Sequence, residues 1–144
     1  MKTIYAKIAA ILAGVIGVMG ISAGAPVLLG RTPSWPVIAW LPVYNVAAGA
    51  VTVLLLSMLL WKHHRYAALA ALTTLGVHTL VMIVLQTVYR DVVAAQSLQA
   101  MTIRIGTWLL ILGLLFLQRR KDSRRVAQRT RRYGGLTRAA SDGR

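Results

Sequence analysis

His78 is the residue whose type and position suggest chemistry most directly. It falls in the middle of a long apolar stretch, with Thr74 four residues before it and Met82 four residues after it on the same helical face. An ionisable side chain at that depth could ligate haem, ligate copper together with Met82, hydrogen-bond a quinone or relay protons. The alternative that we favour is a structural role, in which a neutral imidazole hydrogen-bonds to Thr or Ser across helices.

The other residues of the chain weigh against a cofactor at His78. The remaining histidines, His63 and His64, lie 14 or 15 residues away, which is about 21–22 Å along a helix, so one chain cannot hold haem between two histidines. One His–Met pair offers too few ligands for copper. The chain has no cysteine, which excludes thiolate metal sites and thiol catalysis. The sequence therefore implies no cofactor and no metal, and no enzymatic motif is present.

Several other polar residues are expected near His78 within the apolar stretches. No carboxylate within any apolar stretch neutralises Arg104, so these polar residues could together line a cavity that binds an anion. We favour instead a simpler prediction for Arg104, whose long side chain would extend outward to lipid phosphates. The candidate polar cluster consists of Asn45, Thr74, His78, Gln86 and Arg104.

The composition is that of an all-α integral membrane protein. The chain has 144 residues, of which 57% are hydrophobic and 14% charged, whereas soluble domains have roughly 25% charged residues. Four apolar stretches reach the length of about 20 residues that a membrane span needs. They predict a four-helix transmembrane bundle within residues 1–118, with spans at about 8–29, 43–61, 66–89 and 102–117. We expect the first span to stay uncleaved, although Ala23-Gly24-Ala25 resembles a signal-peptide cleavage site.

The distribution of Lys and Arg predicts the orientation. Fourteen of the 17 basic residues would lie on the side of both termini and of the connection at 62–65. The positive-inside rule then places both termini in the cytoplasm of a cell whose inner (plasma) membrane holds the protein.

The connection at 30–42 is predicted to be a short Pro/Trp-rich outer loop. Proline at positions 33, 36 and 42 interrupts helix formation, while Trp35 and Trp40 make the loop apolar. We expect it to cap the bundle at the membrane surface, with a lid over a site as the alternative.

The final segment, 119–144, is predicted to be a disordered, basic cytoplasmic tail. It has ten basic and two acidic residues and few apolar ones, so it cannot bury a core. We expect it to bind anionic phospholipids, and we consider nucleic acid a less suitable partner. The basic residues that begin the tail are Arg119, Arg120, Lys121, Arg124 and Arg125.

Glycines on the first span predict a helix-packing face. Gly20 and Gly24 form a GxxxG pair, and Gly14 and Gly17 precede them at helical spacing. Small residues allow close helix contact, but the spacing leaves open whether the partner helix belongs to this chain or to another.

Three functions remain compatible with these patterns. We favour a non-catalytic structural or assembly subunit that contacts lipid and binds other membrane subunits or a second copy of itself. A small carrier or pore, with a polar path near His78, Gln86 and Arg104, is the alternative. A quinone-associated or redox membrane subunit is a third hypothesis, which requires partner chains.

Overall fold

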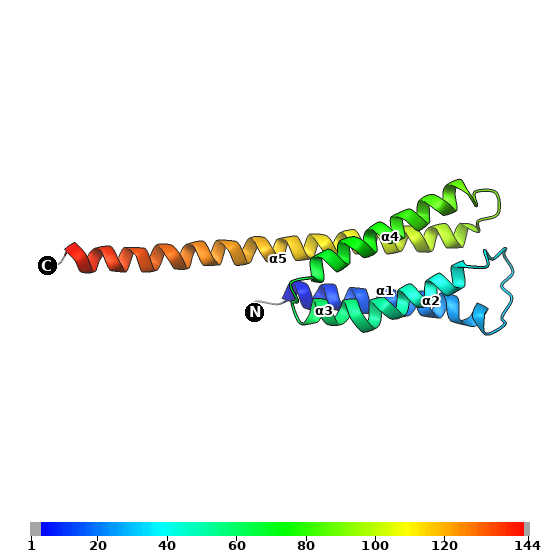
Figure 1. Ribbon diagram of the computed structural model, residues 1–144, viewed down its shortest axis with the longest axis horizontal. Coiled ribbons are helices and arrows are strands. Elements are labelled where there is room, and N and C mark those ends of the chain that lie inside the picture. The colour runs from blue at the N-terminus through cyan, green and yellow to red at the C-terminus, as the bar shows by residue number, and fades with distance from the viewer. Residues whose placement is uncertain (1–3, 143–144) are drawn as a thin grey trace.

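The computed structural model describes the backbone of residues 4–142 and the side chains of residues 4–123. The only regular secondary structure of the described part is helical, and it has no strands (Figure 1). Its helices are α1 (Ile4–Leu28), α2 (Leu41–Val51), the π-helical segment η1 (Thr52–Leu56), α3 (Ser57–Trp61), α4 (Ala67–Thr87) and α5 (Ala95–Asp142). Because α2, η1 and α3 follow one another without a break, they form a single span.

Four of these helical segments are long and apolar enough to cross a membrane. They are Ile4–Leu28, Leu41–Trp61, Ala67–Thr87 and Ala95–Ser123. This confirms the four apolar helices predicted from the sequence and indicates a membrane protein. The observed boundaries differ most at the fourth helix, which begins seven residues earlier than position 102.

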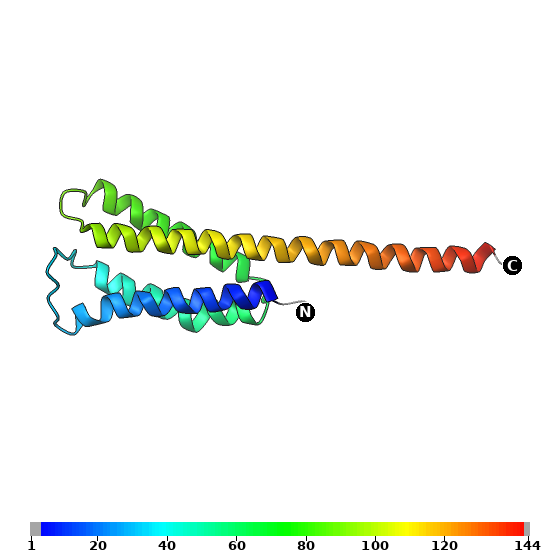
Figure 2. The same ribbon diagram turned by 180° about the vertical axis from the view of Figure 1, so that it is seen from behind.

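The helices pair as two antiparallel hairpins, shown in Figures 1 and 2. One hairpin consists of α1 and the span Leu41–Trp61, and the other consists of α4 and α5. Helix α1 also packs against α5. It therefore contacts its own hairpin partner, the span Leu41–Trp61, and one helix of the other hairpin. The start of α1 and the exit of α5 lie at the same end of the bundle. We call this the basic end, and the opposite end, with connections 29–40 and 88–94, the loop end.

Two apolar clusters hold the hairpins together. Towards the basic end, Trp108 and Ile111 of α5 are fully buried against alanines of α1 and leucines of α3. Small alanine side chains on α1 leave the space that the indole of Trp108 occupies. At the loop end, Leu41, Leu85 and Met101 form the second cluster, with Trp40 and Tyr44 packed on it.

The segment after Arg119 differs from the sequence prediction. The composition predicts a disordered tail, whereas α5 continues as one helix to Asp142 and extends far beyond the bundle (Figure 1). Arg, Lys, Gln and Ala, which dominate this segment, are strong helix formers. The preceding span also supplies an already formed helix, so the unfavourable nucleation step is avoided.

Candidate functional site

The glycines of α1 bring it close to the span Leu41–Trp61 of the same chain. A Cβ atom at Gly24 would lie 2.5 Å from the carbonyl oxygen of Pro42, and one at Gly17 would lie 2.9 Å from that of Gly49. Gly49 in turn leaves no room for a Cβ, which would lie 2.5 Å from the Gly17 oxygen. The partner helix, which the sequence left open, is therefore α2. Gly14 continues this contact next to Ser57.

Arg104 lies inside the bundle. Its side chain is only 5% exposed, and its Nη1 donates a hydrogen bond to Oδ1 of Asn45 over 2.6 Å. The bond joins α5 to α2 and therefore connects the two hairpins. The guanidinium lies close to the backbone of α1, because a Cβ at Gly20 would lie 3.4 Å from Nη2 and 3.1 Å from the carbonyl oxygen of Asn45.

The expectation that Arg104 reaches outward to lipid phosphates is therefore wrong. The reason is the early start of α5 at Ala95. Nine residues of helix precede Arg104, which places it about 13 Å inside the helix instead of at its first turn. From that depth the side chain turns towards α1 and α2.

No carboxylate compensates the charge of Arg104 within the described part of the chain. The acidic residues with described side chains are Asp91 and Asp122. Asp91 pairs with its neighbour Arg90, with both side chains exposed to solvent at the loop end. Asp122 lies at the other end of the bundle, and neither acid forms an ion pair with Arg104. The guanidinium is thus held by a neutral amide.

His78 is buried next to this pair, with 4% of its surface exposed. Its Nδ1 lies 2.9 Å from the carbonyl oxygen of Thr74 in the same helix. The predicted hydrogen bond to a Thr or Ser of another helix is therefore replaced by one within α4. Because a carbonyl only accepts, Nδ1 carries the proton, and Nε2 of the neutral ring is an acceptor.

Aromatic rings surround His78 on two sides. The ring centroids of Tyr44 and Trp108 lie 5.8 Å and 6.5 Å from that of the imidazole. The Tyr44 hydroxyl and Trp108 Nε1 are both buried without a hydrogen-bond partner. Such unpaired donors are unusual inside folded proteins.

A small cavity of about 10 Å³ lies among these polar groups. That volume is close to the minimum that holds one water molecule. Its lining combines donors and acceptors from three spans, namely Thr52 of η1, His78 of α4, and Arg104 and Trp108 of α5. The centre of the bundle is therefore polar, while its outer faces carry exposed apolar side chains.

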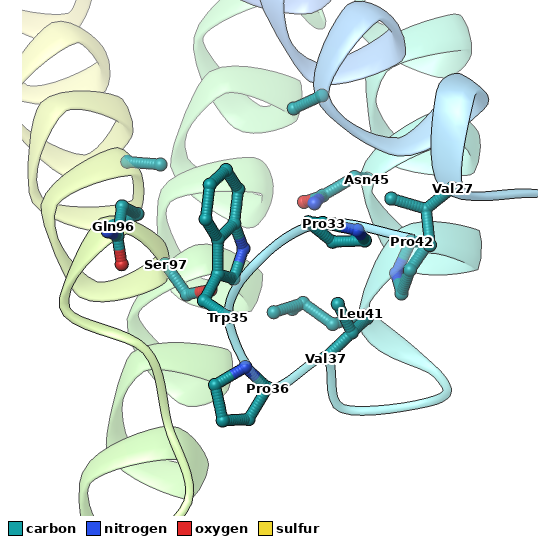
Figure 3. A pocket seen from close by; sticks show the side chains of 12 residues that line it. Val27, Pro33, Trp35, Pro36, Val37, Leu41, Pro42, Asn45, Gln96 and Ser97 are labelled. Atoms are coloured by element: carbon teal, nitrogen blue, oxygen red, sulfur yellow. The ribbon is translucent and has the colours of Figure 1, made fainter. Parts of the chain in front are cut away.

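A larger pocket of about 130 Å³ lies next to Asn45 at the loop end (Figure 3). We call it the outer pocket. Pro33, Trp35 and Pro36 of the 29–40 connection form one wall, and Gln96 and Ser97 of α5 form the other. Its polar side chains are neutral amides and a hydroxyl, without a carboxylate. Asn45 belongs both to this pocket and to the hydrogen bond with Arg104, so it joins the pocket to the buried charge.

The structure brings together only part of the predicted polar cluster. Asn45, His78 and Arg104 come together, and Thr74 contributes its backbone carbonyl while its hydroxyl bonds to Ala70. Gln86 is exposed near the end of α4 and lines neither of these two cavities.

Sequence reasoning missed Tyr44, Thr52 and Trp108 as members of the site. Tyr44 resembles an interfacial aromatic residue, and Thr52 an ordinary residue of an apolar stretch. Trp108 lies well inside the predicted span at 102–117, and that depth is the available signal.

The predicted lipid-binding residues lie at the basic end. Arg119, Arg120 and Lys121 are exposed there, and Lys121 Nζ donates to the Tyr5 hydroxyl over 2.5 Å. The side chains of Arg124 and Arg125 lie outside the described residues.

Comparisons of this chain with protein-family models, curated proteins and solved structures find no match.

Proposed function

We propose that this protein binds a small anion, or the anionic group of a small ligand, in the outer pocket. One observation carries the proposal, which is the burial of Arg104 against a neutral amide. A buried cation without a counter-ion is costly in a low-dielectric interior. An anion next to Asn45 would offset that cost.

Asn45 is suited to link such an anion to Arg104. Its Oδ1 accepts from Nη1, which leaves its NH₂ group as a donor for a ligand in the pocket. Gln96 and Ser97 add donors from the facing wall. The pocket is smaller than the roughly 300–1,000 Å³ of sites for drug-sized molecules, so it suits a small ion or a single anionic group.

The orientation forms part of the same proposal. The positive-inside rule places the basic end in the cytoplasm and the loop end outside. The outer pocket then takes its ligand from the extracytoplasmic side of the inner membrane. The basic tail would contact anionic phospholipids of the cytoplasmic leaflet.

The proposal is tested by anion-dependent stability of the full chain in an uncharged detergent. We would follow thermal unfolding while acetate, chloride, nitrate or phosphate replaces a bulky sulfonate at constant ionic strength. A ligand at 100 times its Kd stabilises the folded state by about 2.7 kcal/mol, so at least one small anion should raise the midpoint with saturation.

Two variants make that test specific. Arg104→Gln should abolish the anion dependence, whereas Arg31→Gln, which removes an exposed charge from the same end of the bundle, should preserve it. If Arg104→Gln does not fold, Asn45→Asp provides an internal counter-ion and should also abolish the dependence. An anion effect that persists in both site variants would contradict the proposal.

A second candidate function, the assembly subunit, is favoured by a separate observation. Gly76 of α4 and Gly106 and Gly113 of α5 face open space, where an added Cβ atom would meet no other described atom within 4 Å. Exposed small residues allow another helix to approach closely. Copurification after mild extraction tests this proposal, and Gly106→Ile with Gly113→Ile should release a partner or second copy without unfolding the chain.

A further inference from the structure

A second pocket lies at the basic end, far from Arg104. It has a volume of about 220 Å³ and lies between α1, the 62–66 connection and α5. Its floor is apolar, because Ala6, Leu60 and Ala67 are buried there beside the half-buried Leu115. The small alanines of α1 and α4 leave the space that forms the pocket.

The rim of this pocket is mostly basic. His63, His64 and Arg65 come from the connection between α3 and α4, and Arg119 comes from α5. Asp122 is the single carboxylate among the described residues of the rim. Neither arginine forms an ion pair with it or with any other described carboxylate, since the described ion pair is at the loop end. With two arginines and one carboxylate, the described rim has a net positive charge.

His63 occupies a backbone conformation that normally favours glycine. Its φ is 53°, and the amides of His63 and His64 donate to the carbonyls of Leu60 and Leu59. These two bonds are those of a Schellman motif, in which the left-handed position is usually glycine. The chain uses glycine at the equivalent position of α1, where Gly30 has a φ of 90°.

The histidine at this position thus retains backbone strain that glycine would relieve. Strained residues cluster at functional sites, and here the strained residue lines a pocket. Its neighbour His64 accepts the Tyr66 amide at Nδ1 over 3.4 Å. A neutral ring with that bond carries its proton on Nε2, which is a donor for an oxygen ligand.

We propose that this pocket binds the phosphate headgroup of an anionic phospholipid from the adjacent leaflet. Arg65 and Arg119 would supply charge and planar donor pairs for the phosphate oxygens, and the histidines would add single donors. The exposed aromatic side chains of Trp61 and Tyr66 flank the connection, and such residues prefer the headgroup level of a bilayer. The apolar floor suits the glycerol and upper acyl chain of a lipid rather than a free ion.

The experiment uses the full chain in nanodiscs that contain phosphatidylglycerol and phosphatidylcholine. Native mass spectrometry after release into mild detergent measures which lipid stays bound. The site variant is Arg65→Gln with Arg119→Gln, and the matched control is Lys7→Gln with Lys62→Gln. The control removes the same charge from exposed residues at the same end that do not line the pocket. Circular dichroism checks that all variants keep their helices.

We expect the wild type and the control to retain phosphatidylglycerol in preference to phosphatidylcholine. The site variant should retain about 25-fold less, because each of its two lost basic contacts near a lipid surface contributes about a fivefold gain. His63→Gly should lower retention about threefold, as loss of one neutral hydrogen bond would, without lowering the thermal midpoint. Lower lipid retention with an unchanged thermal midpoint would show that the imidazole contacts the lipid and does not stabilise the fold.

Three results would overturn the proposal. An equal loss in the control would show binding to diffuse surface charge. Equal retention of phosphatidylcholine would show that the pocket does not select a net negative headgroup. Displacement of the lipid by millimolar inorganic phosphate, with arginine-dependent binding of phosphate alone, would make the ligand a free ion. None of these results involves Arg104, so the outer pocket is tested separately.

Discussion

Replacement of Asn45 by aspartate would give Arg104 a counter-ion from within the protein. The two side chains have nearly the same shape, so Oδ1 should still accept from Nη1 at about the observed 2.6 Å. The change adds one negative charge and removes the NH₂ group that faces a ligand. It therefore mimics a bound anion while blocking its site.

The expected stabilisation follows from two opposing effects. Opposite charges with centres about 4 Å apart attract by about 4 kcal/mol at an effective dielectric constant of 20. Transfer of the new carboxylate from water to a half-buried position costs part of that energy, whereas Arg104 is already desolvated in the native chain. We expect Asn45→Asp to raise the free energy of unfolding by about 1–2 kcal/mol. Asn45→Leu leaves the charged donor without its acceptor and should lower it by about 2 kcal/mol.

Equilibrium unfolding in neutral bicelles, without added small anions, measures both values. Gln96→Glu is the matched control, because it places the same new charge in the same pocket but away from the hydrogen bond with Arg104. If Asn45→Asp destabilises the protein as much as Asn45→Leu does, Arg104 is not an uncompensated cation. An equal gain for Gln96→Glu would assign the effect to the net charge of the pocket.

Three further predictions concern packing and strain. Gly49→Ala should lower the free energy of unfolding by about 1–3 kcal/mol, because the methyl group meets the backbone of α1, whereas Gly113→Ala in open space should not lower it. In the same assay, His78→Gln should change the free energy of unfolding by no more than about 1 kcal/mol, and His78→Leu should lower it by about 1–2 kcal/mol. A larger loss for His78→Gln than for His78→Leu would contradict a structural hydrogen bond of the imidazole. His63→Gly should keep or raise stability by up to about 1 kcal/mol, since it relieves a left-handed conformation; a loss of more than about 1 kcal/mol would show that the imidazole holds the turn.

The four spans could be predicted because each is a continuous apolar stretch of sufficient length. The depth of Arg104 could not, because it depends on where α5 begins. The segment before position 102 is half polar, and its helical pattern fits either a separate interfacial turn or the first turns of the span. The structure has the second arrangement, which moves Arg104 from the membrane surface into the bundle.

The site residues divide in the same way. Some can be recognised from the local sequence, and others only from the packing of the helices. His78 and Asn45 were recognised because polar side chains are rare in apolar stretches. Tyr44 was not, because an aromatic residue near a span end has an ordinary interfacial explanation. Trp108 was not, because only helix packing turns it towards His78. The disordered tail was predicted from charge and low apolar content alone, which omitted the helix-forming tendency of its Arg, Ala and Gln residues.

The most direct test of the central claim is the change in unfolding free energy when a small anion is added, measured in the wild type and in Asn45→Asp. If Arg104 recruits an anion through Asn45, at least one anion stabilises the wild type with saturation, and the same anion has no effect on Asn45→Asp. Equal anion effects in the two proteins, or none in either, would contradict an anion site at this hydrogen bond.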